Sequence, residues 1–194
     1  MNERLIFMRE YSRGAYRAVS YSVANMLIYI PVFLILSVVF LIVSYFMVGL
    51  PSNGFGFYVF VVFMVLVQGS AFATFISGIA PDPLTGNGMG TALMAFMFLF
   101  SGFFIPYDDI PAGWRWFSYL SMFKYPFEGL IKNMIDETVA EGDITQEAGD
   151  DFAKFAGVDI PDMWRAIWAP LIFTFVFRFL FTVVLITKHS GSRK

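Results

Sequence analysis

The sequence has no cysteine, no site for N-linked glycosylation and very few charges over much of its length. Without cysteine, no disulfide can brace a segment outside the membrane. The shortage of charge is more informative, since no Asp, Glu, Lys or Arg lies between Arg17 and Asp82, or between Asp82 and Asp108. Hydrophobic residues make up 58% of the 194 residues and charged residues only 14%. A soluble domain cannot bury so much apolar surface, so we expect an integral membrane protein.

The residues that catalysis requires are also missing. The one His lies in the tail, and the sequence has neither a Gly-x-x-x-x-Gly-Lys-Ser/Thr phosphate loop nor a convergent set of acid and base groups. We therefore expect no enzyme activity, no catalytic residue and no cofactor on this chain. The acidic stretch 136–162 does not fit an EF-hand, because a loop starting at Asp143 lacks Gly at position six and Glu at position twelve. No metal site is expected.

The apolar residues form four segments. A membrane-spanning helix needs about 20 apolar residues, and clusters of Gly, Pro and Asn at 49–56 and 81–88 mark breaks between such segments. The sequence therefore predicts an all-α fold with four transmembrane helices, at 18–48, 57–79, 89–105 and 166–187. The third segment is slightly short for a span. The long segment 106–165, between the third and fourth helices, is expected to lie outside.

The distribution of charge predicts the orientation. Both ends of the chain are rich in Arg and Lys, whereas segment 106–165 holds 12 of the 15 acidic residues and 5 of the 13 basic ones. Because cytoplasmic flanks are enriched in basic residues, we expect both termini to be cytoplasmic. Segment 106–165 is then extracellular.

The amino-terminal segment 2–17 mixes charges of both signs with apolar side chains at helical spacing. Such a helix can lie on anionic lipid headgroups. It can also dock a cytoplasmic partner, because several charge-assisted contacts can hold it outside the lipid. The residues alone leave both interpretations open.

Several motifs resemble ABC transporters of the G subfamily. Their sequences are most similar to those of plant half-size members. The first is the run ERLIFMREYSRGAYR at 3–17, followed by Ser20-Tyr21 and Ile30-Pro31. The later ones are Phe100-Ser101-Gly102-Phe103-Phe104, Ile110-Pro111, Trp114 to Trp116, Tyr125-Pro126-Phe127-Glu128-Gly129-Leu130 and Asn133. The resemblance covers essentially the whole chain. It implies the carboxy-terminal part of an ABC-type transmembrane domain, without a counterpart of the nucleotide-binding domain or of the first two spanning helices.

The resemblance implies a role for the amino-terminal segment. In the family this segment is the coupling helix, so Glu3, Arg4, Arg9 and Glu10 are candidates for contact with a nucleotide-binding domain. That domain would be supplied in cis or in trans. ATP and Mg would be bound there and not by this chain.

The resemblance also assigns roles within the third span. Phe103 and Phe104 correspond to the family's hydrophobic plug, which in a dimer would form a dry constriction. Many relatives carry aliphatic residues at these two positions. Thr91, Ala95 and Phe98, which share one helical face, correspond to residues that face the substrate cavity below the plug.

Segment 106–165 resembles the family's re-entrant helices followed by an extracellular cap. Glu128 is the residue of interest there, because a carboxylate in such a place is either paired or shifted in pKa. Lys124 and Lys132 lie four residues on either side of Glu128, so Glu128 can form an ion pair with either, and Glu128 with Lys132 makes a favourable helical pair.

In the last span, Arg178 has no acid in another predicted span to pair with. We expect a backbone carbonyl, or a group outside this chain, to accept its hydrogen bonds.

Three functions are compatible with this sequence. The first is the translocation part of an ATP-driven exporter of lipids or other amphipathic small molecules, working as a homo- or heterodimer in the plasma membrane. The second is a truncated, non-transporting or regulatory protein that pairs with full-length relatives. The third is an independent four-helix membrane protein, such as a channel. The family resemblance favours the first, and no nucleic-acid partner is expected.

Overall fold

The computed structural model describes residues 18–49, 54–105, 110–155 and 163–190. All regular elements in these ranges are α-helices, which confirms the prediction of an all-α chain. The helices are α2 (Ala18–Val48), α3 (Phe55–Ile79), α4 (Pro83–Leu99), α5 (Arg115–Leu120), α6 (Lys124–Glu141), α7 (Gln146–Phe155) and α8 (Arg165–Ser190).

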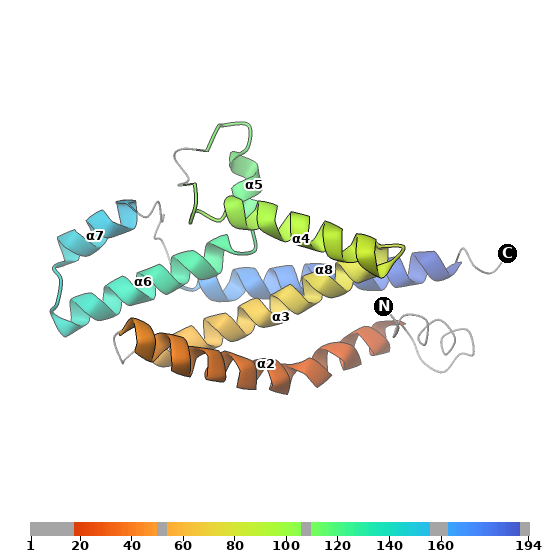
Figure 1. The fold of residues 1–194 in the computed structure, drawn as a ribbon, viewed down its shortest axis with the longest axis horizontal. Helices are drawn as coiled ribbons and strands as arrows, with labels where there is room; N and C mark the ends of the chain where they lie inside the picture. Colours follow the sequence, from red (N-terminus) through yellow and green to blue (C-terminus); the bar gives the residue numbers. More distant parts are fainter. Residues whose placement is uncertain (1–17, 50–53, 106–109, 156–162, 191–194) are drawn as a thin grey trace.

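Three long helices, α2, α3 and α8, run along the length of the molecule (Figure 1). Helix α3 is central, since it contacts α2, α4, α6 and α8, and its most extensive contact is with α8. The start of α2 and the end of α8 lie at the same end of the molecule (Figure 1). We call this the inner end, following the predicted orientation, and the opposite end the outer end.

Within the described ranges, three helices are long and apolar enough to cross a membrane, over Val19–Val48, Phe55–Ile79 and Arg165–Thr187. The mean hydropathy of their most apolar stretches is 3.0, 2.3 and 2.3. Helix α4 has 17 residues, which at 1.5 Å per residue is about 25 Å. It is therefore somewhat shorter than a hydrocarbon core of about 30 Å.

The predicted bounds of the third span, 89–105, are wrong by six residues at each end. Asp82 caps α4, its side chain accepting a hydrogen bond from the Thr85 amide at 2.9 Å, and Pro83 occupies the first helical turn. Pro is favourable there because its missing N–H has no partner in the helix. The Gly and Asn residues at 86–88, which were interpreted as a break, lie inside the helix. At the other end, the positive φ of Gly102 (95°) turns the chain away.

The core lies where α3 meets α8 and α4. Phe72 of α3 packs edge-to-face on Phe177 of α8, with ring centroids 5.3 Å apart, and Met97 of α4 joins the same cluster. Small residues allow close helix approach elsewhere: a Cβ at Gly129 of α6 would collide with the Ala166 side chain of α8. Small residues at such contacts are typical of membrane helix bundles.

Candidate functional site

Helix α4 begins beside a cavity near the inner end. The cavity has a volume of about 320 Å³ and lies between the second half of α3 and the first half of α4. Its lining residues are Phe72, Ala73, Ile76, Ser77, Pro83, Gly86, Asn87, Gly90, Thr91 and Met94. The wall is mostly apolar, with three polar side chains, Ser77, Asn87 and Thr91, which suits an amphipathic ligand.

At its other end, α4 leads into a group of five aromatic rings, which we call the outer aromatic cluster: Phe98, Phe103, Phe104, Phe123 and Phe127. Phe98 contacts Phe103, Phe104 and Phe123 with centroid distances of 6.0, 5.3 and 5.5 Å. Phe103 packs edge-to-face on Phe104 at 4.9 Å and on Phe127 at 5.6 Å. Phe103 and Phe104 nevertheless remain 58% and 57% exposed, so the cluster presents an apolar surface to its surroundings.

The predicted cavity residues separate along α4. Thr91 lines the cavity, whereas Phe98 lies in the outer aromatic cluster with the two predicted plug residues. Ala95 lies between them and is exposed. The helical face that they share therefore leads from the cavity to the outer aromatic cluster.

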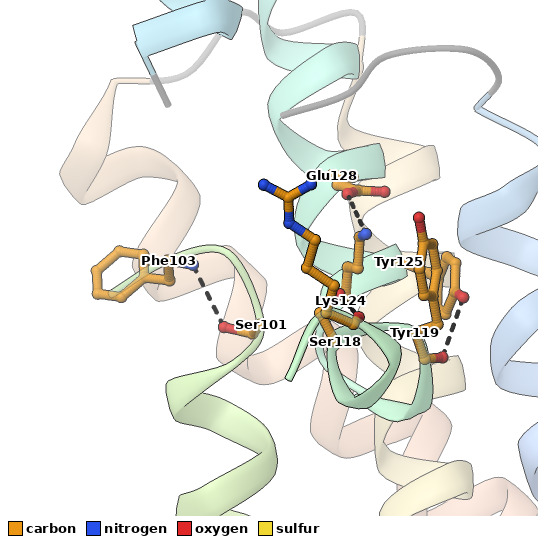
Figure 2. A network of polar contacts seen from close by, with 8 residues as sticks. Ser101, Phe103, Ser118, Tyr119, Lys124, Tyr125 and Glu128 are labelled. Carbon is orange, nitrogen blue, oxygen red and sulfur yellow. Dashed lines mark hydrogen bonds and ion pairs between the residues drawn. The ribbon is translucent and has the colours of Figure 1, made fainter. Parts of the chain in front are cut away.

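The turn after α4 holds Phe103 and Phe104 in place. The Ser101 hydroxyl donates to the Phe98 carbonyl at 2.6 Å. It also accepts a hydrogen bond from the Phe103 amide at 3.4 Å (Figure 2). Because Gly102 has a positive φ, the chain bends directly after the helix. The two rings therefore project from a turn, and not from the last turn of a helix as predicted.

Helices α5 and α6 diverge from the turn between them, residues 121–123, which we call the α5–α6 tip (Figure 1). This tip is bonded to the middle of α3 and to α4. The buried Gln68 of α3 donates from Nε2 to the Met122 carbonyl at 3.1 Å, and the Ser121 hydroxyl donates to the Met97 carbonyl at 2.6 Å. Gln68 lies thirteen residues after Phe55, or about 20 Å along α3. The α5–α6 tip therefore lies roughly halfway along that helix. Gln68 belongs to none of the motifs in the sequence, although a lone amide in a long apolar run is a recognisable signal.

Glu128 lies in a polar network at the start of α6 (Figure 2). Its carboxylate is 3.7 Å from the ammonium group of Lys124, which also lies 4.5 Å from the centre of the Tyr119 ring. Tyr125 donates from its hydroxyl to the Tyr119 carbonyl at 3.1 Å. Burial and the nearby Glu128 raise the pKa of Tyr125.

Of the two lysines that the sequence offers Glu128 as partners, the structure selects Lys124. Lys132 pairs instead with Asp136 at 3.1 Å. The Lys124 and Glu128 side chains are only 10% and 14% exposed, so this pair is largely removed from water.

The predicted coupling residues Glu3, Arg4, Arg9 and Glu10 lie outside the described residues.

These features define a multi-pass, all-helical membrane domain with an apolar cavity and an aromatic outer end. Residues 1–135 match the ABC-2 type transporter family, and the chain belongs to that family. It is 34% identical over 199 residues to ABC transporter G family member 23 of Arabidopsis thaliana, covering 99% of this chain and 32% of the relative. It is 30% identical over 233 residues to ABC transporter G family member 5 of Oryza sativa subsp. japonica, covering 100% of this chain and 30% of the relative.

The resemblance inferred from the motifs is therefore confirmed, and it extends along the whole chain. The chain spans about a third of the length of the curated relatives that it matches. The matched family places it in the membrane domain of such transporters.

Proposed function

We propose that this chain is the translocation part of an ATP-driven exporter of lipids or other amphipathic small molecules. The observation that carries the proposal is the course of α4, which leads from a mostly apolar cavity at Thr91 to an aromatic surface at Phe103 and Phe104. Membership of the ABC-2 type transporter family supports export driven by ATP.

The exporter works as a dimer in this proposal. Two copies of Phe103 and Phe104 meet across the dimer axis and form a plug that excludes water and ions but gives way to a bulky apolar molecule. Their exposure in the single chain supports a further contact. Helix α4 serves as the fourth span, and helices α5 and α6 enter the outer half of the membrane without crossing it.

Energy enters through the amino-terminal segment. Glu3, Arg4, Arg9 and Glu10 contact a nucleotide-binding domain, in cis or in trans, that binds ATP and Mg. Exposed ion pairs are worth about 0 to 1 kcal/mol each, so several must act together. Both termini are cytoplasmic in this proposal, and the plasma membrane is the site of action.

The proposal is tested with the transporter and its nucleotide-binding domains reconstituted into liposomes. We expect ATP to drive movement of a fluorescent phospholipid across the bilayer. We expect no leak of a small dye when ATP is absent. Replacing both plug residues (Phe103→Ala with Phe104→Ala) should raise ATP-independent dye leak several-fold.

The matched control replaces two similarly exposed aromatics of α8, Phe175→Ala with Phe179→Ala, which are 69% and 68% exposed. This control should not leak. An intact transporter that hydrolyses ATP and moves no lipid or other amphipath contradicts the proposed function. An unchanged leak in the plug variant contradicts only the role of Phe103 and Phe104.

A further inference from the structure

Arg178 is a buried cation inside the span of α8. Its side chain is 8% exposed, and it lies thirteen residues from the start of a helix that is long enough to cross the membrane. A guanidinium does not lose its proton in proteins. A charge at the centre of a bilayer costs about 2.5 to 3.5 kcal/mol on insertion scales, so this position needs a reason beyond packing.

The acceptors for Arg178 come from the first turns of α2. Its Nη1 donates to the Ser22 carbonyl and to Oδ1 of Asn25, both at 3.4 Å. The expectation that a backbone carbonyl serves Arg178 is therefore confirmed. Both bonds are longer than the usual 2.9 to 3.0 Å, and Nε has no acceptor among the described groups. The guanidinium is thus incompletely satisfied, and a small approach of α2 to α8 would strengthen its bonds.

Helix α2 is attached to the rest of the molecule near its two ends. At the outer end, Leu41 and Tyr45 pack against Tyr58 of α3. At the inner end, Tyr21 packs against Phe181 and Leu185 of α8, beside the Arg178 contact.

The part of α2 between these attachments is mostly exposed. Its exposed apolar residues include Leu27, Ile28, Val32, Leu34, Ile35 and Leu36. Pro31 lies in this part, where the missing N–H and the ring weaken the helix and allow it to bend. Helix α2 therefore has an inner arm, residues 18–30, and an outer arm, residues 32–48, with a weak point between them.

We propose that Arg178 is a positioning residue that fastens the inner arm of α2 to α8, so that movement of the segment before α2 is passed to α8. The inference rests on the proposed function, because the movement is the one that ATP drives. The contact runs from a side chain of α8 to the first turns of α2, directly after segment 1–17. A displaced inner arm therefore acts on α8 through Arg178 while the outer arm stays with α3.

Arginine suits this role better than lysine. Its planar guanidinium fixes the direction of both hydrogens on Nη1, and this one nitrogen donates to the Ser22 carbonyl and to Oδ1 of Asn25. Lysine offers a compact point charge on a flexible stem. Arg178→Lys should therefore retain part of the fastening, and Arg178→Leu none of it.

The first experiment measures the fastening without any transport. Spin labels are placed on the exposed positions Val23→Cys and Ile186→Cys of the reconstituted transporter, since this chain contributes no cysteine of its own. We expect Arg178→Leu to broaden the distance distribution between the labels toward longer distances. Phe179→Leu, at a residue that is 68% exposed, is the matched control and should leave the distribution unchanged. An unchanged distribution in Arg178→Leu overturns the inference.

The second experiment measures coupling as the amount of lipid moved per ATP hydrolysed, normalised to folded protein. We expect Arg178→Leu to lower this ratio by about tenfold, within the range of typical coupling effects, while basal ATP hydrolysis is retained. Arg178→Lys should recover part of the ratio, and Asn25→Leu should lower it less than Arg178→Leu. A purely structural role would lower the folded amount and leave the ratio intact, which overturns the inference.

The two experiments separate this inference from the proposed function. If the unsubstituted transporter hydrolyses ATP and moves no lipid or other amphipath but Arg178→Leu broadens the label distances, the proposed function fails and the fastening of α2 to α8 stands. If the transporter moves lipid and Arg178→Leu changes neither the distances nor the ratio, the proposed function stands and Arg178 has no positioning role.

Discussion

Helices α2 and α3 are both long apolar spans, yet they occupy different environments. The most apolar 18-residue stretch of α2 has a mean hydropathy of 3.0, and 11% of this stretch is buried. The corresponding stretch of α3 has a mean hydropathy of 2.3, and 33% of it is buried. The more apolar helix is thus the less buried one. Hydrophobicity explains why both helices enter a membrane, but not which of them becomes the centre of the bundle.

The difference lies in small and polar residues. Helix α3 carries Gln68, which bonds to the α5–α6 tip, and Gly78, where Phe181 of α8 approaches closely. In α2, the buried Ser37 donates its hydroxyl to the Leu34 carbonyl of the same helix. The bonds that Ser22 and Asn25 of α2 accept from Arg178 of α8 are long, at 3.4 Å. Lipid is as apolar as Leu, so apolar side chains alone give helices little reason to associate in a membrane. Close approach and hydrogen bonds between helices select the neighbours.

The largest effect should follow from adding a side-chain atom where two helices approach each other closely. Gly129→Ala adds a methyl group that collides with Ala166, and overpacking of this kind costs about 1 to 3 kcal/mol. We expect a clear fall in the melting temperature of the protein in lipid nanodiscs.

Gly88→Ala is the control, because a Cβ there meets no atom within 4 Å. It should be neutral or slightly stabilising, since Ala favours a helix over Gly by about 1 kcal/mol. Equal melting temperatures for the two variants would show that small residues do not determine this packing.

The second prediction concerns the outer attachment of α2. Tyr45 packs edge-to-face on Phe55 and Tyr58, with centroid distances of 5.1 and 5.4 Å. Aromatic pairs contribute about 0.5 to 1.5 kcal/mol each, so losing both pairs in Tyr45→Ala should cost about 1 to 3 kcal/mol in the same melting assay. Phe46→Ala removes a neighbouring ring that is 77% exposed, and it should cost much less. If both cost the same, the outer attachment of α2 is not made by Tyr45.

The third prediction compares two buried polar groups. Gln68→Met keeps the approximate shape but loses the bond to the Met122 carbonyl, at a cost of about 1 kcal/mol. It should also loosen the α5–α6 tip, seen as faster labelling of a cysteine at the buried Met122 (Met122→Cys), whose backbone carbonyl is retained, by a membrane-permeant thiol reagent. Ser37→Ala removes a hydroxyl that bonds only within α2 in the described structure, and it should leave the labelling rate unchanged. Faster labelling in both variants would contradict the role of Gln68.

The sequence predicted the class of fold well, because the charge-free runs and the Gly and Pro clusters report directly on the membrane. It predicted α2 at the bounds that the structure has, 18–48, and α3 and α8 within three residues at either end. The bounds of α4 were wrong, because Gly and Asn at 86–88 were treated as a break. The capped start at Asp82 and Pro83 outweighs the weak helix propensity of these three residues.

The site was predicted less completely than the fold. The motif placed Phe103 and Phe104 together at the end of an apolar helix, and the structure adds that they follow the helix in a turn and that Phe98 joins them. The partners of Gln68 and Arg178 could not be predicted, because they are backbone carbonyls, which are present at every residue. A sequence can show that a buried polar side chain needs an acceptor, but only the arrangement of helices shows which carbonyl lies within reach.

The smallest effect should come from the cap of α4, which lies outside any close helix contact. Asp82 accepts hydrogen bonds from the Thr85 amide at 2.9 Å and from its hydroxyl at 2.7 Å, and these bonds lower the pKa of Asp82. A carboxyl whose pKa is lowered by folding contributes stability above its unfolded pKa of about 4, and this stability is lost as the pH falls through the lower folded value. Asp82→Asn keeps a capping oxygen and removes the charge. Its melting temperature should therefore lie slightly below that of the unsubstituted protein at neutral pH, and the difference should vanish in acid. A difference that persists unchanged below pH of about 3 would mean that the cap acts through shape and not through its charge.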